Sequence, residues 1–277
     1  MSTSFETVAT DLDHPEGVAP GPDGRLYAGG EAGQIYRIDA GGSAEELAST
    51  GGFIYGVTLD AAGNVYACDY GNASLVRISP EGRVRTYSSG APDRPMRMPN
   101  FSAFDDGGNL YVTDSGEWGD DDGVIYRVAN DGTTIVWTDL APRFPNGCCL
   151  DAQGRTLLVV ESHGRAIVAV PILADGTAGE PQRVADLTGS QPDGIALAED
   201  GSMFVGCYRP DTIFRVSPDG SAAVFAEDPD GVILNQPTNV AFAGDGLDRL
   251  VVSSLGGWSL IATAAGVRGL PLRYPAL

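Results

Sequence analysis

Lysine is missing from this sequence of 277 residues: its basic residues are 17 arginines, against 37 aspartates and glutamates. Without a lysine ammonium group the chain has no Schiff-base nucleophile, no pyridoxal site and no phosphate-binding P-loop. The formal net charge of −20 repels phosphate groups, so we expect no nucleic-acid partner. Most of the acidic excess is interpreted as a solvated, self-repelling surface.

Long apolar runs are missing as well. No stretch approaches the roughly 20 apolar residues that a membrane helix needs, so we expect no membrane partner. The first residues, Met1 to Glu6, have neither the basic start nor the apolar stretch of a secretory signal, and we expect a cytoplasmic location. The 4 cysteines form no C-x-x-C pair, and we predict that they are reduced and buried.

Helix-breaking residues, by contrast, are frequent and spread along the chain, with 38 Gly and 18 Pro. A unit of an apolar strand, a Gly-containing turn, a second apolar strand, a loop and a third strand recurs six times. The six turns lie at residues 22–24, 61–64, 106–109, 152–154, 199–201 and 244–246. This pattern favours many short strands over a helical bundle.

The spacing of the units predicts the fold. The residues that open the first strand of each unit are Glu16, Tyr55, Asn100, Asn146, Asp193 and Thr238, with steps of 39, 45, 46, 47 and 45 residues between them. Such a period is typical of a β-propeller. We predict an all-β six-bladed β-propeller with four-stranded antiparallel blades, a single domain over residues 1–277. The strand at about residues 5–10 should complete blade six and close the ring.

The six opening positions should converge at one end of the central channel. Their carboxylates and amides are ligands that suit a hard divalent cation, with Ca²⁺ expected first and Mg²⁺, Mn²⁺, Zn²⁺ or Fe²⁺ as alternatives. We predict that the cation is bound by Glu16, Asn100, Asn146 and Asp193. Two alternatives stay open: polar groups that only bind trapped water, and a cation that is purely structural.

Four motifs at blade spacing point to a known family. They are Glu16-Gly17, Pro99-Asn100, Phe144-Pro145-Asn146-Gly147 and Pro192-Asp193-Gly194. Together they resemble the metal-site motifs of the senescence marker protein 30, gluconolactonase and diisopropyl fluorophosphatase group. The resemblance implies one catalytic divalent cation on Glu16, Asn100, Asn146 and Asp193, and hydrolysis of aldonolactones or, in some members, of phosphotriesters. Sugar lactonases of that family often have an Arg two residues before the first Asn, where this chain has Met98, with Arg97 beside it.

The loops between second and third strands should surround the mouth of the channel, where function concentrates in such folds. We expect substrate contacts from aromatic, arginine and amide side chains there. The candidates are Arg97, Trp118, Tyr208, Arg209, Asn239 and Trp258. Three acids near the channel, Asp69, Asp114 and Glu161, are expected to support the amide ligands through hydrogen bonds.

These residues favour a metal-dependent lactone hydrolase that acts on a small-molecule substrate, with Asp193 as the candidate catalytic base and direct nucleophilic attack by Asp193 as the alternative. With only His14 and His163, and no Gly-x-Ser-x-Gly or H-E-x-x-H motif, serine hydrolase and zinc protease functions are disfavoured. The alternatives are an organophosphate or other ester hydrolase on the same metal, and a non-catalytic ligand-binding propeller with a structural cation. A strictosidine synthase-like propeller is a further alternative, because such proteins share motifs like residues 33–38. We expect a monomer or a weak homo-oligomer.

Overall fold

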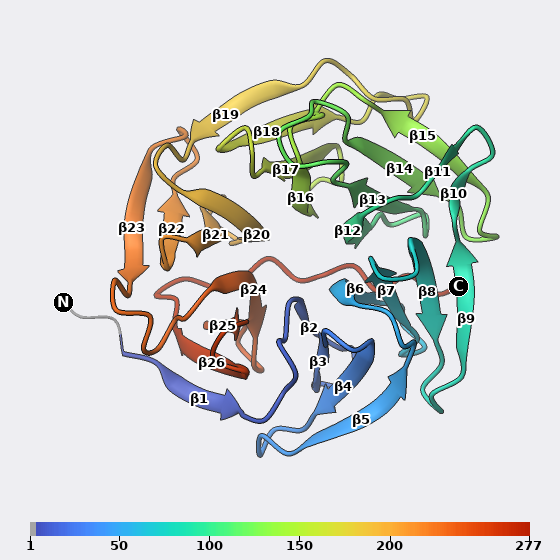
Figure 1. Cartoon of the computed structure of the whole chain (residues 1–277). Coiled ribbons are helices and arrows are strands. Elements are labelled where there is room, and N and C mark those ends of the chain that lie inside the picture. The colour runs from blue at the N-terminus through green and yellow to red at the C-terminus, as the bar shows by residue number, and fades with distance from the viewer. Residues whose placement is uncertain (1–3) are drawn as a thin grey trace.

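The computed structural model describes residues 4–277 as a ring of six four-stranded antiparallel sheets around a central channel, which confirms the predicted six-bladed β-propeller (Figure 1). All regular elements among the described residues are β-strands. Within residues 4–277 there is accordingly no helix that could cross a membrane.

The first three blades follow one another along the chain, each running from the channel outward. Blade 1 contains β2 (Val18–Pro20), β3 (Leu26–Gly29), β4 (Gln34–Ile38) and β5 (Ala44–Ser49). Blade 2 contains β6 (Ile54–Leu59), β7 (Val65–Asp69), β8 (Ser74–Ile78) and β9 (Val84–Ser88). Blade 3 contains β12 (Pro99–Phe104), β13 (Leu110–Asp114), β14 (Val124–Val128) and β15 (Thr134–Thr138). A short hairpin that the sequence pattern does not predict joins blades 2 and 3, with strands β10 (Gly90–Ala91) and β11 (Arg94–Pro95).

Blades 4 and 5 repeat this order, and blade 6 is completed from the start of the chain. Blade 4 contains β16 (Pro145–Leu150), β17 (Thr156–Glu161), β18 (Ala166–Pro171) and β19 (Gln182–Asp186). Blade 5 contains β20 (Gln191–Leu197), β21 (Met203–Arg209), β22 (Thr212–Val216) and β23 (Ala222–Glu227). Blade 6 contains β24 (Pro237–Ala243), β25 (Arg249–Ser254), β26 (Ser259–Ala264) and β1 (Glu6–Ala9).

Pairing of β1 with β26 confirms the predicted closure of the ring. The two strands are antiparallel, with Thr7 opposite Ile261. The Thr263 hydroxyl donates a hydrogen bond to the Ser4 carbonyl (2.7 Å), and Arg249 forms an ion pair with Glu6 (2.6 Å). The closure covers the edge of β26, which would otherwise be free to pair with another chain.

The acidic turns have a clear local cause. In blade 2, an Asp60 side-chain oxygen accepts hydrogen bonds from the backbone amides of Ala62 and Asn64, and Gly63 adopts a positive φ of 78°. Asp105 makes the same pair of bonds to Gly107 and Asn109 in blade 3. Asp side chains favour such turns because they replace a backbone hydrogen bond. Part of the excess of acidic residues is therefore explained by aspartates that stabilise turns.

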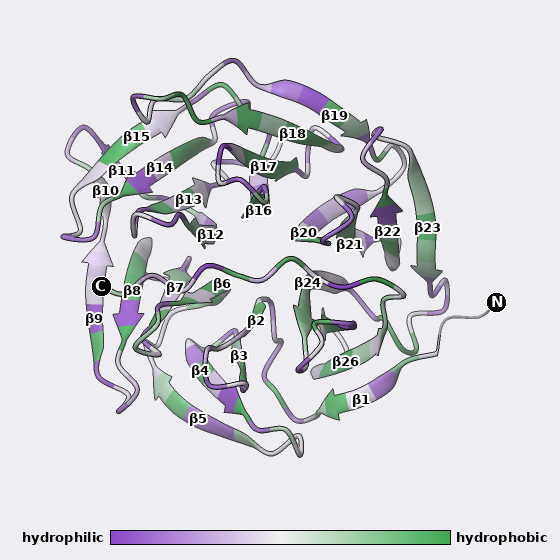
Figure 2. Ribbon diagram, turned by 180° about the vertical axis from the view of Figure 1, so that it is seen from behind, coloured by the Kyte–Doolittle hydropathy of each residue, from purple (hydrophilic) through white to green (hydrophobic). Residues whose placement is uncertain are grey.

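The hydrophobic core lies between neighbouring blades. One cluster combines Tyr66 and Leu75 of blade 2 with Phe104, Val112 and Tyr126 of blade 3. The outer strands have more exposed residues, as in β5, and Figure 2 shows the mixed polar and apolar character of these strands. The four cysteines are free, as predicted, and Cys149 is less buried than the other three.

Residues 265–277 form a C-terminal tail that the repeat does not predict. The tail crosses the centre of the ring in Figures 1 and 2. It is fixed to several blades: the Leu270 amide donates to the Leu197 carbonyl, the Tyr274 hydroxyl donates to the Pro20 carbonyl, and the Pro275 carbonyl accepts from Ala61. Between tail and inner strands lies an apolar cavity of about 150 Å³. The tail thus covers one end of the channel.

Candidate functional site

A β-bulge lies at the opening position of five inner strands. In β12 the pairing register breaks between Pro99 and Phe101, around Asn100. Similar breaks occur around the other positions, at Ile54/Val57, Pro145/Cys148, Pro192/Ile195 and Pro237/Asn239. A bulge releases a residue from the ladder and redirects its side chain. The bulges explain how residues that begin strands can point into the channel.

The four predicted metal ligands meet in one pocket. Glu16, Asn100, Asn146 and Asp193 come from four different blades and all line a cavity of about 420 Å³. Further along the same inner strands, residues such as Cys148 and Ile195 line the apolar cavity under the C-terminal tail. The pocket and the tail therefore occupy opposite ends of the channel.

Glycine follows four of the six opening residues because the inner strands approach closely. A Cβ atom on Gly17 would lie 2.4 Å from the Tyr55 carbonyl oxygen, and one on Gly147 would lie 2.7 Å from that of Asp193. A Cβ atom on Gly56 would lie 2.8 Å from the Asn100 carbonyl oxygen, and one on Gly194 would lie 2.8 Å from the Thr238 carbonyl oxygen. Each glycine thus allows the opening residue of the next blade to approach the channel axis.

Hydroxyl groups connect the blades beside the pocket. Thr238 donates to the Glu16 carbonyl (2.9 Å), and Thr113 donates to the Asn146 carbonyl (2.8 Å). The Ser162 hydroxyl donates to the Pro192 carbonyl (2.6 Å), next to Asp193. These bonds, two of them buried, fix the backbone that presents the pocket side chains.

Two carboxyl groups share the pocket. Burial raises the pKa of Glu16 to about 7, and a hydrogen bond with Thr238 opposes the shift. Burial, followed by repulsion from Glu16, raises the pKa of Asp193 well above its ordinary value, against a hydrogen bond from Asn146. Burial and these two acids also raise the pKa of Tyr55. Like charges in a buried site disfavour ionisation of both carboxyl groups.

The donor set fits a hard divalent cation. Two carboxyl and two amide side chains offer oxygen atoms, the donors that Ca²⁺ and Mg²⁺ take in proteins. Among the described residues that line the pocket there is no arginine to compensate the two acids. A bound cation of charge two would neutralise both carboxylates and offset the burial, and for Asp193 also the repulsion from Glu16, that raise their pKa values.

Three further acids that were predicted to support the site are buried. Their carboxylates accept hydrogen bonds from backbone amides. Asp114 accepts hydrogen bonds from the amides of Arg97 (2.7 Å) and Met98 (3.2 Å), just before Asn100. Glu161 accepts from the Arg143 amide (2.9 Å), and Asp69 accepts from the Phe53 amide (3.2 Å). These three acids therefore fix the segments that enter inner strands, and within residues 4–277 none of them is recorded as accepting a hydrogen bond from the Asn100 or Asn146 side chain.

Of the six predicted substrate contacts, Trp118 and Tyr208 line the pocket. The other four do not belong to its lining. Arg97 is paired with Asp122 (2.5 Å), and Arg209 is paired with Asp211 (3.0 Å). A buried side-chain oxygen of Asn239 has no hydrogen-bond partner in the structure, and the Trp258 indole donates to His14 (3.1 Å).

Sequence reasoning missed part of the pocket wall. Phe53, Phe144, Gln191 and Leu255 also line the pocket. Three of them, Phe53, Phe144 and Gln191, lie two residues before an opening residue. This spacing is the signal that could have identified them. Phe144 packs edge-on against Trp118 (4.9 Å between centroids), which also contacts His163 (5.5 Å).

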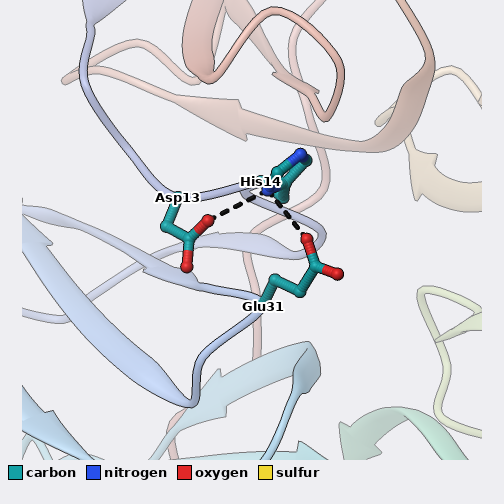
Figure 3. Close-up of side chains that lie close together, drawn as sticks. All are labelled: Asp13, His14 and Glu31. Atoms are coloured by element: carbon teal, nitrogen blue, oxygen red, sulfur yellow. Dashed lines mark hydrogen bonds and ion pairs between the residues drawn. The ribbon is translucent and has the colours of Figure 1, made fainter.

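A second cluster, Asp13, His14 and Glu31, lies where blade 6 meets blade 1 (Figure 3). His14 Nδ1 is 2.9 Å from Asp13 and 2.8 Å from Glu31. Trp258 Nε1 can only donate, so His14 Nε2 accepts, and in neutral His14 the proton is on Nδ1. That proton occupies the position that a metal ion would need. The cluster therefore acts as a hydrogen-bonded connection across the closure of the ring.

The chain belongs to the SMP-30/gluconolactonase/LRE-like family, whose model matches residues 31–256. A model of the strictosidine synthase-like N-terminal region matches residues 3–38. A curated relative, Protein STRICTOSIDINE SYNTHASE-LIKE 3 of Arabidopsis thaliana, is 31% identical over 165 residues. That match covers 53% of this chain and 41% of the relative, so the chain spans less than half of that protein's length.

Two solved structures illustrate the likeness of fold. A gluconolactonase from Xanthomonas campestris has a TM-score of 0.81 at 19% identity, covering 95% of this chain and 89% of that chain. A calcium-binding protein, regucalcin, from Agrobacterium tumefaciens has a TM-score of 0.79 at 17% identity, covering 99% of this chain and 97% of that chain. At these identities the likeness shows the shared propeller fold.

Proposed function

We propose that this protein is a metal-dependent lactone hydrolase whose active site is the pocket formed by Glu16, Asn100, Asn146 and Asp193. The observation that carries the proposal is the meeting of these four oxygen donors from separate blades in one cavity. Family membership supports a lactonase-type activity, and one fold relative is a gluconolactonase. The similar propeller of a calcium-binding protein supports Ca²⁺ as the cation.

The chain's own groups supply a path for the proton. We assign Asp193 as the general base: its carboxylate takes a proton from a water molecule that attacks the lactone carbonyl carbon. The ring C–O bond then breaks, Asp193 returns the proton to the leaving alkoxide oxygen, and the product is a hydroxy acid. Glu16, Asn100, Asn146 and Asp193 would hold the cation, and a cation in this position would supply Lewis acidity that stabilises negative charge on the carbonyl oxygen. The hydrogen bond from Asn146 orients the Asp193 carboxyl group.

Substitution of the pocket side chains tests the proposal. Asp193→Ala and Asn146→Ala should lower kcat/KM for lactone hydrolysis by about 10²-fold or more, since each removes the base or a ligand. The matched controls, Asp245→Ala and Asn130→Ala, change exposed residues away from the pocket and should keep full activity. Circular dichroism and the melting temperature verify folding. Full activity in the two pocket variants would contradict the assignment.

Three other functions remain alternatives for specific reasons. An organophosphate or other ester hydrolase would use the same four donors, and a panel of lactones and phosphotriesters separates it from a lactonase. A strictosidine synthase-like function is suggested by the partial match to the Arabidopsis relative. We rank it lower because we do not expect that group to retain all four metal-type residues. A ligand-binding propeller with a structural cation predicts that chelation lowers the melting temperature while no lactone is hydrolysed.

A further inference from the structure

The pocket offers few polar partners to a substrate beyond the four central donors. The remaining lining side chains with a polar atom are Ser162, Gln191, Trp118 and the two tyrosines at positions 55 and 208. The Ser162 hydroxyl already donates to the Pro192 carbonyl (2.6 Å). The Tyr208 hydroxyl already accepts a hydrogen bond from Gln236 (3.1 Å). A ligand with many hydroxyl groups would leave several of them without partners, which lowers its affinity.

Apolar surface dominates the rest of the wall, and aromatic rings provide most of it. On one side Phe53 packs edge-on against Tyr55 (4.8 Å), which stacks on Tyr70 (5.2 Å, 12° between planes). On the other side Trp118 packs against Phe144 (4.9 Å). These contacts fix the rings in place. An apolar group could therefore bind between them with little cost in free energy for ordering the side chains of the wall.

The charged residues around the pocket also bear on the choice of substrate. The rim arginines Arg97 and Arg209 are each paired with an aspartate, and Arg143 lies 3.5 Å from Asp121. No basic side chain belongs to the pocket lining in the described part of the chain. An anionic substrate would therefore find no cationic side chain to bind its charge, which favours a neutral substrate.

The apolar surface continues outside the pocket. Val232 and Ile233 are 78% and 50% exposed in the loop between β23 and β24. This loop lies at the pocket end of the channel, because it leads into the opening position of β24. Its base contacts two pocket residues: Gln236 donates to Tyr208, and the Gln236 carbonyl accepts from the Leu255 amide (3.1 Å). The exposed Val232 and Ile233 side chains thus belong to a loop whose base contacts the pocket wall.

We infer that the preferred substrates are neutral esters with an apolar alkyl or aryl substituent, such as alkyl-substituted lactones, rather than polyhydroxylated sugar lactones. The inference rests on the proposed hydrolase function. In it, the ester group sits on the four central donors, the substituent lies between the aromatic walls, and Trp118 is a specificity-determining residue.

The test measures kcat/KM for three lactones with the full-length chain in excess Ca²⁺. They are an alkyl-substituted γ-lactone, unsubstituted γ-butyrolactone and gluconolactone. The alkyl lactone should be hydrolysed at least about tenfold more efficiently than gluconolactone, because its substituent gains apolar contacts and leaves no hydroxyl unpaired. Gluconolactone as the better substrate would overturn the inference while leaving the hydrolase function intact. Failure of all three lactones would refute the proposed function, and the inference with it.

A substitution at Trp118 tests whether the aromatic wall of the pocket causes the preference for alkyl-substituted lactones. Trp118→Ala should raise KM for the alkyl lactone by about tenfold and leave kcat nearly unchanged, with little effect on γ-butyrolactone. Trp118 is 52% exposed, so its removal should not unfold the chain. The matched control is Ile135→Ala, at a residue that is 50% exposed on the outer strand β15. An equal loss on all three lactones, or no loss on the alkyl lactone, would contradict a specificity role for Trp118.

Discussion

Glu16 and Asp193 face one pocket without a basic residue on its lining, so each raises the cost of ionising the other. The pKa of about 7 for Glu16 lies above the ordinary value of a glutamate. An acid whose pKa is raised by folding stabilises the fold in its protonated form. That stability is fully present below the ordinary pKa and is lost as the pH rises through about 7. A cation that binds the ionised pair should oppose the loss.

We predict that the melting temperature of the chelated protein falls between about pH 5 and 8, and that added Ca²⁺ raises it most at the upper end of this range. Differential scanning fluorimetry with and without a chelator measures both effects. The control is Glu16→Gln, which resembles the protonated acid and should show a shallower dependence on pH. Identical pH profiles for the chelated protein and this variant would contradict the prediction.

At single positions, the sequence was informative where a repeat fixed the geometry. Glu16 and Asp193 could be placed together because the blade period relates their backbones. Arg97 and Arg209 could not be placed, because a long side chain reaches whichever partner is near, and here Asp122 and Asp211 are nearest. The aromatic walls depend on rotamers and on packing between loops, which the period does not determine.

Among the elements, the inner strands show why close packing matters for the site. A Cβ atom at position 194 would lie 2.7 Å from the Asn239 Cα atom and 2.8 Å from the Thr238 carbonyl oxygen. Both are backbone atoms of the next blade, so a flexible side chain cannot relieve the contact. The same glycine follows Asp193 directly, and a shift of the strand would move that carboxyl group.

We predict that Gly194→Ala destabilises the protein by about 1–3 kcal/mol, through overpacking, and lowers lactonase activity at temperatures where the chain is folded. Urea unfolding and kinetic assays measure the two effects. Gly246→Ala is the matched control, because the nearest atom to its new Cβ would lie 3.4 Å away. Equal stability of the two variants would show that the inner strands can separate without cost.

The strands themselves were predictable from alternating apolar residues and turn glycines. Their bulges were not, because a register break is a property of two paired strands. The sequence also did not predict the hairpin of β10 and β11, because strands of two residues are too short to show a periodic pattern.

At the scale of the whole molecule, the C-terminal tail joins blades that are distant in sequence. Besides its bonds to Leu197, Pro20 and Ala61, it places Arg273 Nε 3.0 Å from Asp106 of blade 3 and Nη2 2.9 Å from the Asp151 carbonyl of blade 4. Its sequence has neither the length nor the alternation of a strand, so only the three-dimensional structure shows this function of the tail.

We predict that removing residues 270–277 lowers the melting temperature by several degrees but keeps lactonase activity at low temperature, because tail and pocket lie at opposite ends of the channel. Tyr274→Phe, which removes only the hydrogen bond to Pro20, should cost about 1 kcal/mol. Scanning calorimetry compares the two variants with the full chain. An unchanged melting temperature after truncation would mean that the tail does not connect the blades.

Closure of the ring by β1 has a consequence for how the protein is made. A ribosome releases β1 well before its partner β26, because 249 residues lie between Ala9 and Ser259. Blades 1 to 5 can each pair their strands during synthesis, because those strands are consecutive. Until β26 has been synthesised, β1 remains an unpaired strand, and it could pair with strands of other nascent chains. Completion of blade 6 is therefore the step at which chaperone assistance should matter most for yield.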